Sequence, residues 1–508
     1  MVQSLVHMLH NMVLKVPDAE AIIYGETRVT YEQLWLTSLS VAHLLSKQNL
    51  QKHDRIAILL ENSPEYVATY YGAQAAGGVA VGLNTAAKAR DLENWIRHSG
   101  ATWLFADASH TELSNLIQAC GKDIKIVLVG ENNTIHTEFT WNNIVNSKNK
   151  EFDLSNVTNS NDPAAIIYTS GTTGNPKGVT LSNKNLVTNI ESILAYLKLT
   201  ENDRILNVLP FYYTYGNSIL HTHLAVGGSI ILENSMMYPH RVLEKMVSEK
   251  VTGFSGVPST FALLLGRTNL RDYDLSTVRY MTQAGGPMPP ANIEQLLEAV
   301  PHIQFFVMYG QTEASARLTY LPPDKIFEKL GSVGIPIPGV EIEIHDEHNK
   351  VVNEGVTGEI CARGENIMLG YWNDPESTKQ VIKNGWLHTG DLAHVDSDGF
   401  LYIDGRSSDM IKSGANRISP KEIEEVIAEL KEVLEVAVVG APDNILGQII
   451  KAVIVLRPGE NLDTKDVKAY CKRNLADYKI PKLIDFTDTI PKTASGKIQR
   501  YKLQEQYK

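Results

Sequence analysis

Short apolar runs alternate with helical patterns through most of the first 400 residues of the chain. Residues 56–60, 124–129 and 205–209 are short, mostly apolar stretches, which are typical of buried strands. Residues 91–97 and 239–247 carry apolar side chains at helical spacing, which predicts helices. Alternation of buried strands with helices is typical of α/β layering.

The pattern changes after residues 404–408. Ser419, Pro420 and Glu422 predict a helix start, with Ser419 as the N-cap and Glu422 closing a capping box. An apolar stripe follows, made of Ile423, Val426, Ile427 and Leu430. Strands are predicted over 436–440 and 452–456, and a helix over 464–475.

These patterns predict an α/β protein with two domains of unequal size. We expect a large N-terminal domain of layered α/β subdomains over residues 1–403 and a hinge over 404–408. A small α+β C-terminal lid domain is expected over 409–508. The length of 508 residues exceeds a single ordinary domain and agrees with this division.

Composition narrows the class of protein and of partner. The chain is 43% hydrophobic and 21% charged, as soluble globular proteins are. Its net charge of −11 argues against nucleic acid as the main partner. The sequence lacks a run of about 18 apolar residues, so we expect no membrane span. It begins without a basic segment followed by an apolar one, so we expect a cytoplasmic location.

The three cysteines, Cys120, Cys361 and Cys471, are scattered along the chain. They lack the spacing of metal ligands, so a reducing compartment is predicted and a zinc site is not. His221 and His223 are two residues apart, but without a third partner nearby we interpret them as pocket or packing residues.

The most informative segment is Tyr-Thr-Ser-Gly-Thr-Thr-Gly-Asn-Pro-Lys-Gly-Val, residues 168–179. Glycines allow tight turns that bring backbone N–H groups close to an anion, and hydroxyls add donors. Lys177 adds a positive charge suited to a polyphosphate. The loop follows an apolar run, so we expect it at the end of a strand. Its other candidate phosphate ligands are Thr169, Ser170, Gly171, Thr172, Thr173 and Gly174.

Two further segments carry groups that suit a nucleotide. Tyr309, Gly310, Thr312 and Glu313 follow an apolar strand and offer a flat ring, a hydroxyl and a carboxylate for a purine, a phosphate and Mg²⁺. Asp391, in a predicted turn after residues 386–388, could accept hydrogen bonds from ribose hydroxyls or simply form the turn.

Taken in order, these segments resemble the motifs of the adenylate-forming enzymes: acyl-CoA synthetases, firefly-type luciferases and the adenylation domains of peptide synthetases. Gly285 and Gly286, Arg406, Arg417 and the Gly-Lys pair ending at Lys497 extend the match over residues 168–500. The chain is most similar to a freestanding acid–thiol ligase of this superfamily.

The resemblance implies a role for each segment. Lys177 and Mg²⁺, with Glu313 as metal ligand, would neutralise the pyrophosphate, and Thr312 would contact the α-phosphate. Tyr309 would stack on adenine beside the turn at residues 285–286, and Asp391, Arg406 and Arg417 would surround the ribose and phosphate. Lys497, on a mobile loop, would bridge the two anions that react.

The resemblance also implies the reaction. A carboxylate attacks ATP to give acyl-adenylate and pyrophosphate; the small domain then rotates, and a thiol of CoA or phosphopantetheine takes the acyl group and releases AMP. A carrier protein acting in trans is an alternative acceptor. A luciferase-like oxidoreductase or an ATP-binding protein without turnover are the alternatives from other classes.

The acid pocket is expected at residues 209–217 and near 257–260. Its candidate walls are Tyr213, Thr214, Tyr215, Asn217, Val257, Ser259 and Thr260. Thr214 stands where amino-acid-activating domains usually carry Asp, and Tyr213 where CoA ligases often carry His. An unpaired ammonium costs several kcal/mol, so a neutral aliphatic or aromatic acid is predicted. An imino acid such as proline, or a β-amino acid, stays open if a carboxylate enters from elsewhere.

Two other positions depart from the family pattern. Ser408 replaces the usual Asp or Lys of the hinge, and Ala415 stands where many relatives have Gly beside the pantetheine tunnel.

Overall fold

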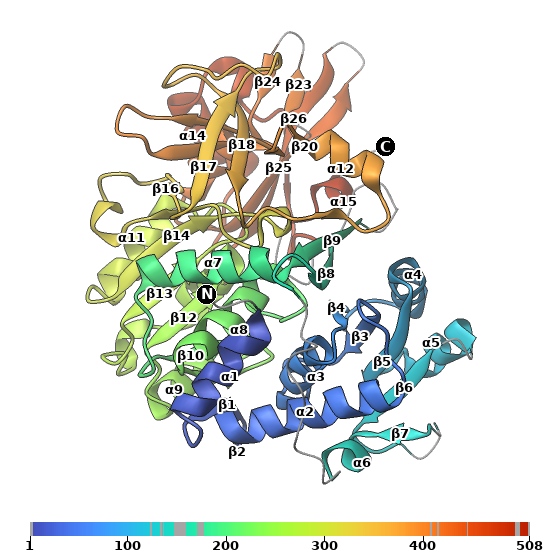
Figure 1. The fold of residues 1–508 in the computed structure, drawn as a ribbon. Helices are drawn as coiled ribbons and strands as arrows, with labels where there is room; N and C mark the ends of the chain where they lie inside the picture. The colour runs from blue at the N-terminus through green and yellow to red at the C-terminus, as the bar shows by residue number, and fades with distance from the viewer. Residues whose placement is uncertain are drawn as a thin grey trace.

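The structure, a computed structural model, describes residues 4–121, 124–132, 135, 137–146, 159–169, 177–406, 409–413, 416–443, 446–492 and 498–505. Two large sheets form most of the N-terminal domain (Figure 1). The first has nine strands in the order β16-β15-β14-β13-β12-β10-β11-β1-β2. Their bounds are β1 Glu20–Tyr24, β2 Thr27–Thr30, β10 Arg204–Asn207, β11 Ser229–Leu232, β12 Gly253–Gly256, β13 Tyr280–Gln283, β14 Gln304–Tyr309, β15 Thr319–Leu321 and β16 Ile335–Pro336.

The second large sheet has eight strands in the order β19-β9-β8-β4-β3-β5-β6-β7. Their bounds are β3 Arg55–Leu59, β4 Val79–Gly82, β5 Ala101–Asp107, β6 Lys125–Val129, β7 Phe139–Thr140, β8 Pro163–Thr169, β9 Lys177–Ser182 and β19 Gly370–Tyr371. Strands β3, β4, β5, β6 and β8 run parallel, as expected for strands separated by helices.

Helices cover both sheets. They are α1 Leu5–Lys15, α2 Tyr31–Lys47, α3 Pro64–Ala75, α4 Ala89–Ser99, α5 Leu113–Cys120, α6 Trp141–Val145, α7 Asn183–Leu197, α8 Thr214–Val226, α9 Pro239–Ser248, α10 Pro258–Arg267 and α11 Pro290–Ala299, with short 3₁₀ turns η3 Leu270–Asp272, η4 Thr312–Ala314 and η5 Pro323–Lys325. One continuous core joins α1, α2, α3, α7 and α8 to strands of both sheets, so these helices are sandwiched between them. Separate apolar clusters place α9, α10 and α11 against the first sheet and α4 and α5 against the second.

A third, five-stranded sheet follows the two large ones. Its elements are β17 Val340–His345, β18 Gly358–Gly364, β20 Ile382–Lys383, β21 Trp386–Val395 and β22 Leu401–Arg406, with α12 Pro375–Val381 alongside. Strands β17, β18 and β21 are antiparallel neighbours with β18 in the middle. This sheet leads the chain into the C-terminal unit.

The C-terminal unit is a small α+β domain, as predicted. Its elements are β23 Ile411–Ser413, β24 Asn416–Ile418, α13 Pro420–Ala428, β25 Val433–Asp443, β26 Gly447–Leu456, α14 Thr464–Asn474, η6 Asp477–Lys479, β27 Leu483–Phe486 and α15 Arg500–Glu505. Its own apolar cluster contains Ile423, Ile427 and Val467. It lies at the opposite end of the molecule from α1 and α2 (Figure 1).

The predicted capping box at the start of α13 is wrong. The Ser419 side chain caps no N–H of the helix; its hydroxyl instead donates to the carbonyl oxygen of Asp404. The Glu422 carboxylate accepts hydrogen bonds from Lys479 Nζ at 2.6 and 2.7 Å. Tertiary partners thus replace the local pairing that the sequence pattern favours.

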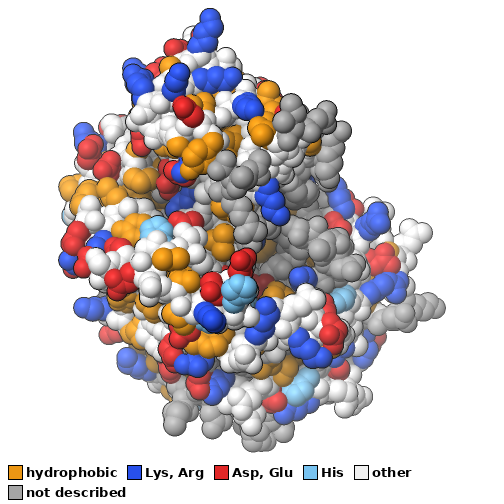
Figure 2. Space-filling view, turned by 90° about the horizontal axis from the view of Figure 1, so that it is seen from above, with side chains coloured by type: hydrophobic (Ala, Val, Ile, Leu, Met, Phe, Trp, Pro, Cys, Tyr) orange, Lys and Arg blue, Asp and Glu red, His pale blue; other side chains and the backbone are white. Residues whose placement is uncertain are grey.

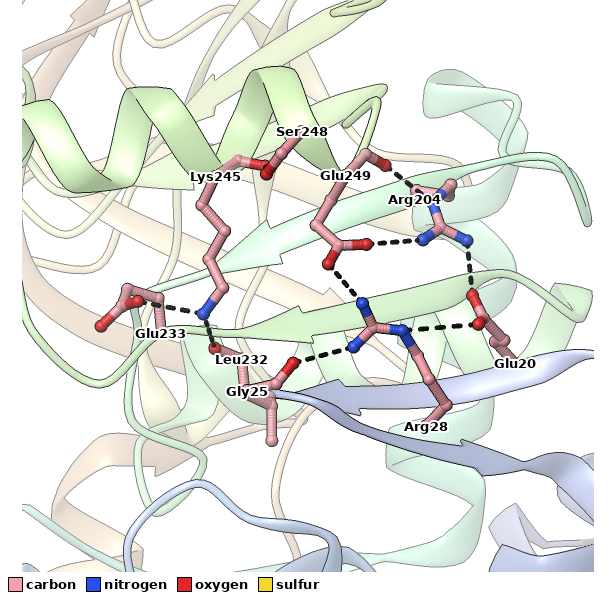
Figure 3. Close-up of polar contacts among 9 residues, drawn as sticks. All are labelled: Glu20, Gly25, Arg28, Arg204, Leu232, Glu233, Lys245, Ser248 and Glu249. Atoms are coloured by element: carbon pink, nitrogen blue, oxygen red, sulfur yellow. Dashed lines mark hydrogen bonds and ion pairs between the residues drawn. The ribbon is translucent and has the colours of Figure 1, made fainter.

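Within the first large sheet, an ion-pair cluster ties the hairpin β1–β2 to β10 and to the end of α9 (Figure 3). The Glu249 carboxylate lies between two guanidinium groups, 2.6 Å from Arg28 Nη2 and 3.1 Å from Arg204 Nη2. Glu20 closes the ring, 2.9 Å from Arg204 Nη1. The alternation of charges lets two arginines share one region without repulsion.

Lys, Arg, Asp and Glu side chains are interspersed over the face drawn in Figure 2. Across the described residues, none of the helices combines the length and apolar character needed to cross a bilayer.

Candidate active site

Four of the sequence motifs meet at the carboxyl ends of parallel strands. β10, β12, β13 and β14 are parallel neighbours in the first large sheet. The chain leaves their carboxyl ends into residues 213–217, 257–260, 285–286 and 309–313. Ligands of open α/β sheets bind in crevices outside these strand ends, so the fold gathers the motifs where a site is expected.

The phosphate-loop motif joins two antiparallel strands, which confirms its placement at a strand end. Thr169 ends β8, Lys177 begins β9, and the two residues are cross-strand partners. Ser170, Gly171, Thr172, Thr173 and Gly174 lie outside the described residues. The described ends of the loop therefore fix where its backbone leaves and re-enters the sheet.

Tyr371 links the phosphate-loop lysine to the candidate metal ligand. Strand β19, which carries Tyr371, pairs with β9, so the ring lies beside Lys177. Lys177 Nζ is 5.0 Å from the ring centroid, and the Tyr371 hydroxyl donates to Glu313 Oε1 at 2.8 Å. Because Oε1 takes this bond, Oε2 is the oxygen that suits a hard cation such as Mg²⁺. Sequence reasoning missed Tyr371, since nothing in its local sequence points to Glu313.

The predicted acid-pocket segment is bonded directly to the nucleotide motif. Tyr213 is the N-cap of α8, and Thr214 is its first residue. The Thr214 and Thr312 hydroxyls lie 2.9 Å apart, in hydrogen-bond contact. Thr312 starts η4 next to Glu313. The predicted acid-pocket segment and the candidate phosphate and metal ligands are thus in direct contact.

Tyr215 is held on both its ring and its hydroxyl. Its hydroxyl lies 2.8 Å from Thr282 Oγ1 on β13, and the Arg317 guanidinium carbon is 4.2 Å from its ring centroid. Arg317 is only 4% exposed. It was not predicted from sequence, where it falls outside the motif. One face of the Tyr215 ring is therefore already occupied by a cation.

Other predicted pocket residues have partners within the protein. Asn217 is buried, and its Oδ1 is 3.1 Å from His221 Nε2, while His221 Nδ1 is 2.8 Å from the Tyr71 hydroxyl. Burial lowers the pKa of His221 to about 3, so its imidazole is neutral at pH 7. His223 bonds the Tyr280 hydroxyl at 2.8 Å. Both histidines are buried and bonded within the protein, which agrees with their interpretation as pocket or packing residues.

The candidate adenine turn packs on the start of α10. Val257 is the N-cap of that helix, Ser259 lies in its first turn, and Thr260 Oγ1 accepts a hydrogen bond from the Val257 N–H at 3.3 Å. A Cβ added at Gly285 would lie 3.2 Å from Val257 Cγ1, and its φ of +89° favours glycine in any case. Gly285 therefore brings the turn against one of the predicted pocket walls, with Gly286 next to it.

Gly310 is required by backbone packing. A Cβ at this position would lie 2.0 Å from the carbonyl oxygen of Ala316, so only glycine fits. The close approach folds the chain back after β14 and positions the residues that follow, Thr312 and Glu313.

Asp391 joins Tyr309 and Arg406. Its Oδ2 accepts from the Tyr309 hydroxyl at 2.6 Å, and its Oδ1 accepts from Arg406 Nε at 3.0 Å. Asp391 is 5% exposed, and Tyr309 is buried. Burial and the nearby Asp391 carboxylate hold the pKa of Tyr309 well above its usual value, so its hydroxyl remains a donor.

The predicted turn around Asp391 is wrong. Residues 389–391 lie inside β21, where the register against β18 shifts between Glu359 and Cys361. The bulge places Gly390 at φ +74°, and the Gly390 N–H donates to Glu359 Oε1 at 2.9 Å. A bulge re-aims a side chain without ending the strand, which explains how Asp391 reaches Tyr309.

Two predicted site residues of the C-terminal part, Lys497 and Arg417, cannot be placed in the site. Lys497 lies outside the described residues, as do Ser408 and Ala415. Arg417 lies on β24, and its side chain is outside the described part of the chain.

Comparison with known proteins agrees with this geometry. The profile of the AMP-binding enzyme family matches residues 9–372, and that of the AMP-binding enzyme C-terminal domain matches residues 422–497. A long-chain-fatty-acid–CoA ligase of Bacillus subtilis (strain 168) is 31% identical over 532 residues, covering 99% of this chain and 94% of the relative.

Solved structures of ligases have the same fold. The anthranilate CoA ligase AuaEII in complex with anthranoyl-AMP has a TM-score of 0.92 at 27% identity, covering 100% of this chain and 98% of that one. The O-succinylbenzoate coenzyme A synthetase of Bacillus subtilis in complex with ATP and magnesium ion has a TM-score of 0.85 at 30% identity, covering 98% of each chain. This chain belongs to the AMP-binding enzyme family and is an AMP-forming acid–thiol ligase.

Proposed function

We propose that this enzyme activates a neutral aliphatic or aromatic carboxylic acid with ATP and transfers the acyl group to CoA. The observation that carries the proposal is the contact between Thr214 and Thr312, 2.9 Å apart. It joins an uncharged, tyrosine-rich pocket segment directly to the residues that suit phosphate and metal. An acid bound along this segment would present its carboxylate next to the α-phosphate.

Charge in the pocket favours an acid without an ammonium group. Residues 213–217 contain no acidic side chain. His221 is neutral, and the Arg317 cation already lies over the Tyr215 ring at 4.2 Å, where an imino acid would need its cation–π contact. An ammonium brought here would meet a like charge and lose its hydration. Proline and primary α-amino acids are therefore poor candidates.

The names of relatives support CoA as the acceptor. The Bacillus subtilis relative is named for a long-chain fatty acid and CoA, and the anthranilate ligase for an aromatic acid and CoA. Both acid types suit a neutral pocket. A carrier protein is the alternative acceptor, and neither of these relatives is named for one.

We assign the steps of adenylation to residues as follows. Lys177 and Glu313 lie on either side of Tyr371, in a position to hold the polyphosphate and Mg²⁺. Mg²⁺, when bound, offsets the charge of the pyrophosphate that leaves. Tyr309 contacts adenine, and Asp391 accepts from the ribose hydroxyls while Arg406 keeps the carboxylate in place. Lys497 neutralises charge as the acid carboxylate attacks the α-phosphate.

Residues 404–408 are the proposed hinge between the two half-reactions. On its N-terminal side Asp404 is anchored to the large domain, with Oδ2 accepting from Thr357 at 2.7 Å. On its C-terminal side Ser419 bonds the Asp404 carbonyl, and Lys421 Nζ donates to the Ile403 carbonyl at 2.8 Å. Rotation about this segment would exchange these few polar contacts for others, which suits a movable lid.

Pyrophosphate release across a panel of acids tests the substrate class. Benzoate, anthranilate, medium- and long-chain fatty acids, proline, phenylalanine and leucine are compared at equal concentration with ATP and Mg²⁺. A neutral acid should give the highest rate, at least tenfold above any α-amino acid, which corresponds to about 1.4 kcal/mol. A higher rate with phenylalanine, leucine or proline would show that the pocket argument is wrong.

A further inference from the structure

A second cluster of chemically active side chains lies in the third sheet, apart from the pocket segments. His345 is the last residue of β17, Cys361 lies on the central strand β18, and His388 lies on β21. Cys361 pairs across the sheet with His388 on one side and with Glu343 on the other. One ligand-type atom from each of the three residues lies within 4.8 Å of the others. All three side chains are buried, with exposed fractions of 8% for His345, 0% for Cys361 and 8% for His388.

Each imidazole of this cluster is held by a carboxylate through one nitrogen. His345 Nε2 is 2.7 Å from Glu343 Oε2, and His388 Nδ1 is 2.8 Å from Glu359 Oε2. This is the arrangement in which metal-ligating histidines occur, because the carboxylate fixes the tautomer and leaves the other nitrogen as a lone-pair donor. Figure 1 shows β17 and β18 side by side in this sheet.

The remaining donor atoms lack ordinary partners or face each other. His345 Nδ1 is buried and makes no hydrogen bond with the described residues. His388 Nε2 lies 4.0 Å from Cys361 Sγ, and His388 Nδ1, the nitrogen held by Glu359, lies 3.5 Å from the same sulfur. A buried imidazole nitrogen without a partner is costly, so an unpaired lone pair in this cluster points to a missing ligand.

The charges around the cluster also favour a cation. The Glu343 and Glu359 carboxylates, which hold the two imidazoles, place negative charge beside the cluster. A divalent metal would compensate this charge and stabilise a thiolate. One thiol and two imidazoles form a soft ligand set that selects zinc-class metals over Mg²⁺.

We propose that His345 Nδ1, Cys361 Sγ and His388 Nε2 bind a divalent transition metal of the zinc class, with water completing a tetrahedron. Binding would release the Cys361 thiol proton to solvent. Metal–ligand bonds of about 2.0–2.3 Å place tetrahedral ligand atoms roughly 3.3–3.7 Å apart. The ligand atoms, which lie within 4.8 Å of one another, therefore have to approach by up to about 1 Å when a metal binds.

The proposed metal site is separated from the nucleotide motif by one carboxylate. Glu359 uses Oε2 for His388 and Oε1 for the Gly390 N–H, in the bulge that carries Asp391. The site differs from the one proposed for Mg²⁺ at Glu313, which offers hard oxygen ligands and no sulfur. A metal probe that reports sulfur ligation distinguishes the two.

The test is a Co²⁺ titration of the chelator-treated, nucleotide-free, full-length protein. Tetrahedral Co²⁺ with one thiolate gives intense visible bands and a sulfur-to-metal charge-transfer band in the near ultraviolet. We expect one equivalent of Co²⁺ to produce both, and one equivalent of Zn²⁺ to remove them. Wild-type protein that gives no charge-transfer band in excess Co²⁺ would overturn the proposal, whatever the variants do.

Matched variants assign the ligands. Cys361→Ser should abolish the charge-transfer band, whereas Cys471→Ser, at a cysteine equally buried in the C-terminal unit, should retain it. Glu343→Gln changes a partly exposed carboxylate that only positions His345, and it should weaken Co²⁺ binding by about 10- to 100-fold while the band keeps its shape. A band that persists in Cys361→Ser, or Co²⁺ affinity unchanged in Glu343→Gln, would contradict the assignment.

Discussion

Replacing Asp391 by Asn isolates the contribution of a negative charge to nucleotide binding. The side chain is 5% exposed, and its two oxygens face Tyr309 and Arg406 at 2.6 and 3.0 Å. Asn keeps the size of the side chain and one acceptor but loses the charge and presents an N–H₂ donor on the other side. Ribose hydroxyls that donate to the carboxylate would then meet a donor or a weaker acceptor.

The expected loss follows from the kind of hydrogen bond removed. A hydrogen bond to a charged group contributes about 1.5–3 kcal/mol. At 1.4 kcal/mol per factor of ten, the dissociation constants of ATP and AMP should rise about 10- to 100-fold. Isothermal titration calorimetry on folded protein, checked by circular dichroism, measures both constants.

Asp396→Asn is the matched control. Asp396 follows the far end of β21 and pairs with Lys329 Nζ at 2.9 Å, away from the nucleotide motifs. Its loss should leave both dissociation constants unchanged, because the Asp396 carboxylate accepts hydrogen bonds from Lys329, Asp398 and Phe400 and, among the described residues, from none of the nucleotide motifs. An unchanged constant in Asp391→Asn, or an equal loss in Asp396→Asn, would refute the assignment of Asp391 to the ribose.

Three other predictions concern different parts of the protein. Lys497→Ala should slow adenylate formation by roughly two orders of magnitude or more while ATP binding persists, because its charge acts mainly in the transition state; near wild-type pyrophosphate exchange would contradict this. Tyr371→Phe should raise the Mg²⁺ concentration for half-maximal pyrophosphate release by about tenfold, since Glu313 loses the hydroxyl that orients it; an unchanged Mg²⁺ requirement would count against it. Glu249→Gln should lower the melting temperature by only about 1–3 °C and leave the affinity for ATP unchanged. A change in ATP affinity would contradict this prediction, because it would show that the ion-pair cluster is coupled to the nucleotide site.

The sequence was sufficient to predict helices and strands wherever the apolar pattern within one segment determines them. Most of the predicted strands and helices begin and end within two residues of an observed element; β3 and α9 are examples. The strands predicted over 436–440 and 452–456 are parts of the longer strands β25 and β26. Apolar periodicity reports which face of an element is buried, and most strands of the two large sheets are buried on both faces. The order of the motifs was enough to find the family and the strand ends at which the site lies.

Predictions of local structure were wrong where the hydrogen-bond partner of a residue comes from a distant part of the chain. The capping box at Ser419 has the right sequence, but the hydroxyl bonds Asp404 instead. The Gly390 segment resembles a turn, yet Glu359 holds its N–H group within a strand as a bulge. Both outcomes depend on groups from another element, whose proximity no local pattern encodes.

Contacts between segments that are far apart in the sequence could not be predicted either. Tyr371 meets Glu313 across 58 positions of sequence, and the His345, Cys361 and His388 cluster comes from three strands. The spacing of the cysteines argued against a zinc site, but it could not show that strand pairing brings Cys361 beside two histidines. Spacing rules apply to ligands on one loop or helix, not to side chains that a sheet brings together.

Product analysis of the complete reaction tests the central claim most directly. The enzyme is incubated with ATP, Mg²⁺, CoA and a neutral acid from the panel, and acyl-CoA, AMP and pyrophosphate are quantified by mass spectrometry. The account predicts equal amounts of the three products, dependent on both the acid and CoA. Failure of every neutral acid to form a CoA thioester, while an α-amino acid releases pyrophosphate or is loaded onto a carrier protein, would contradict it.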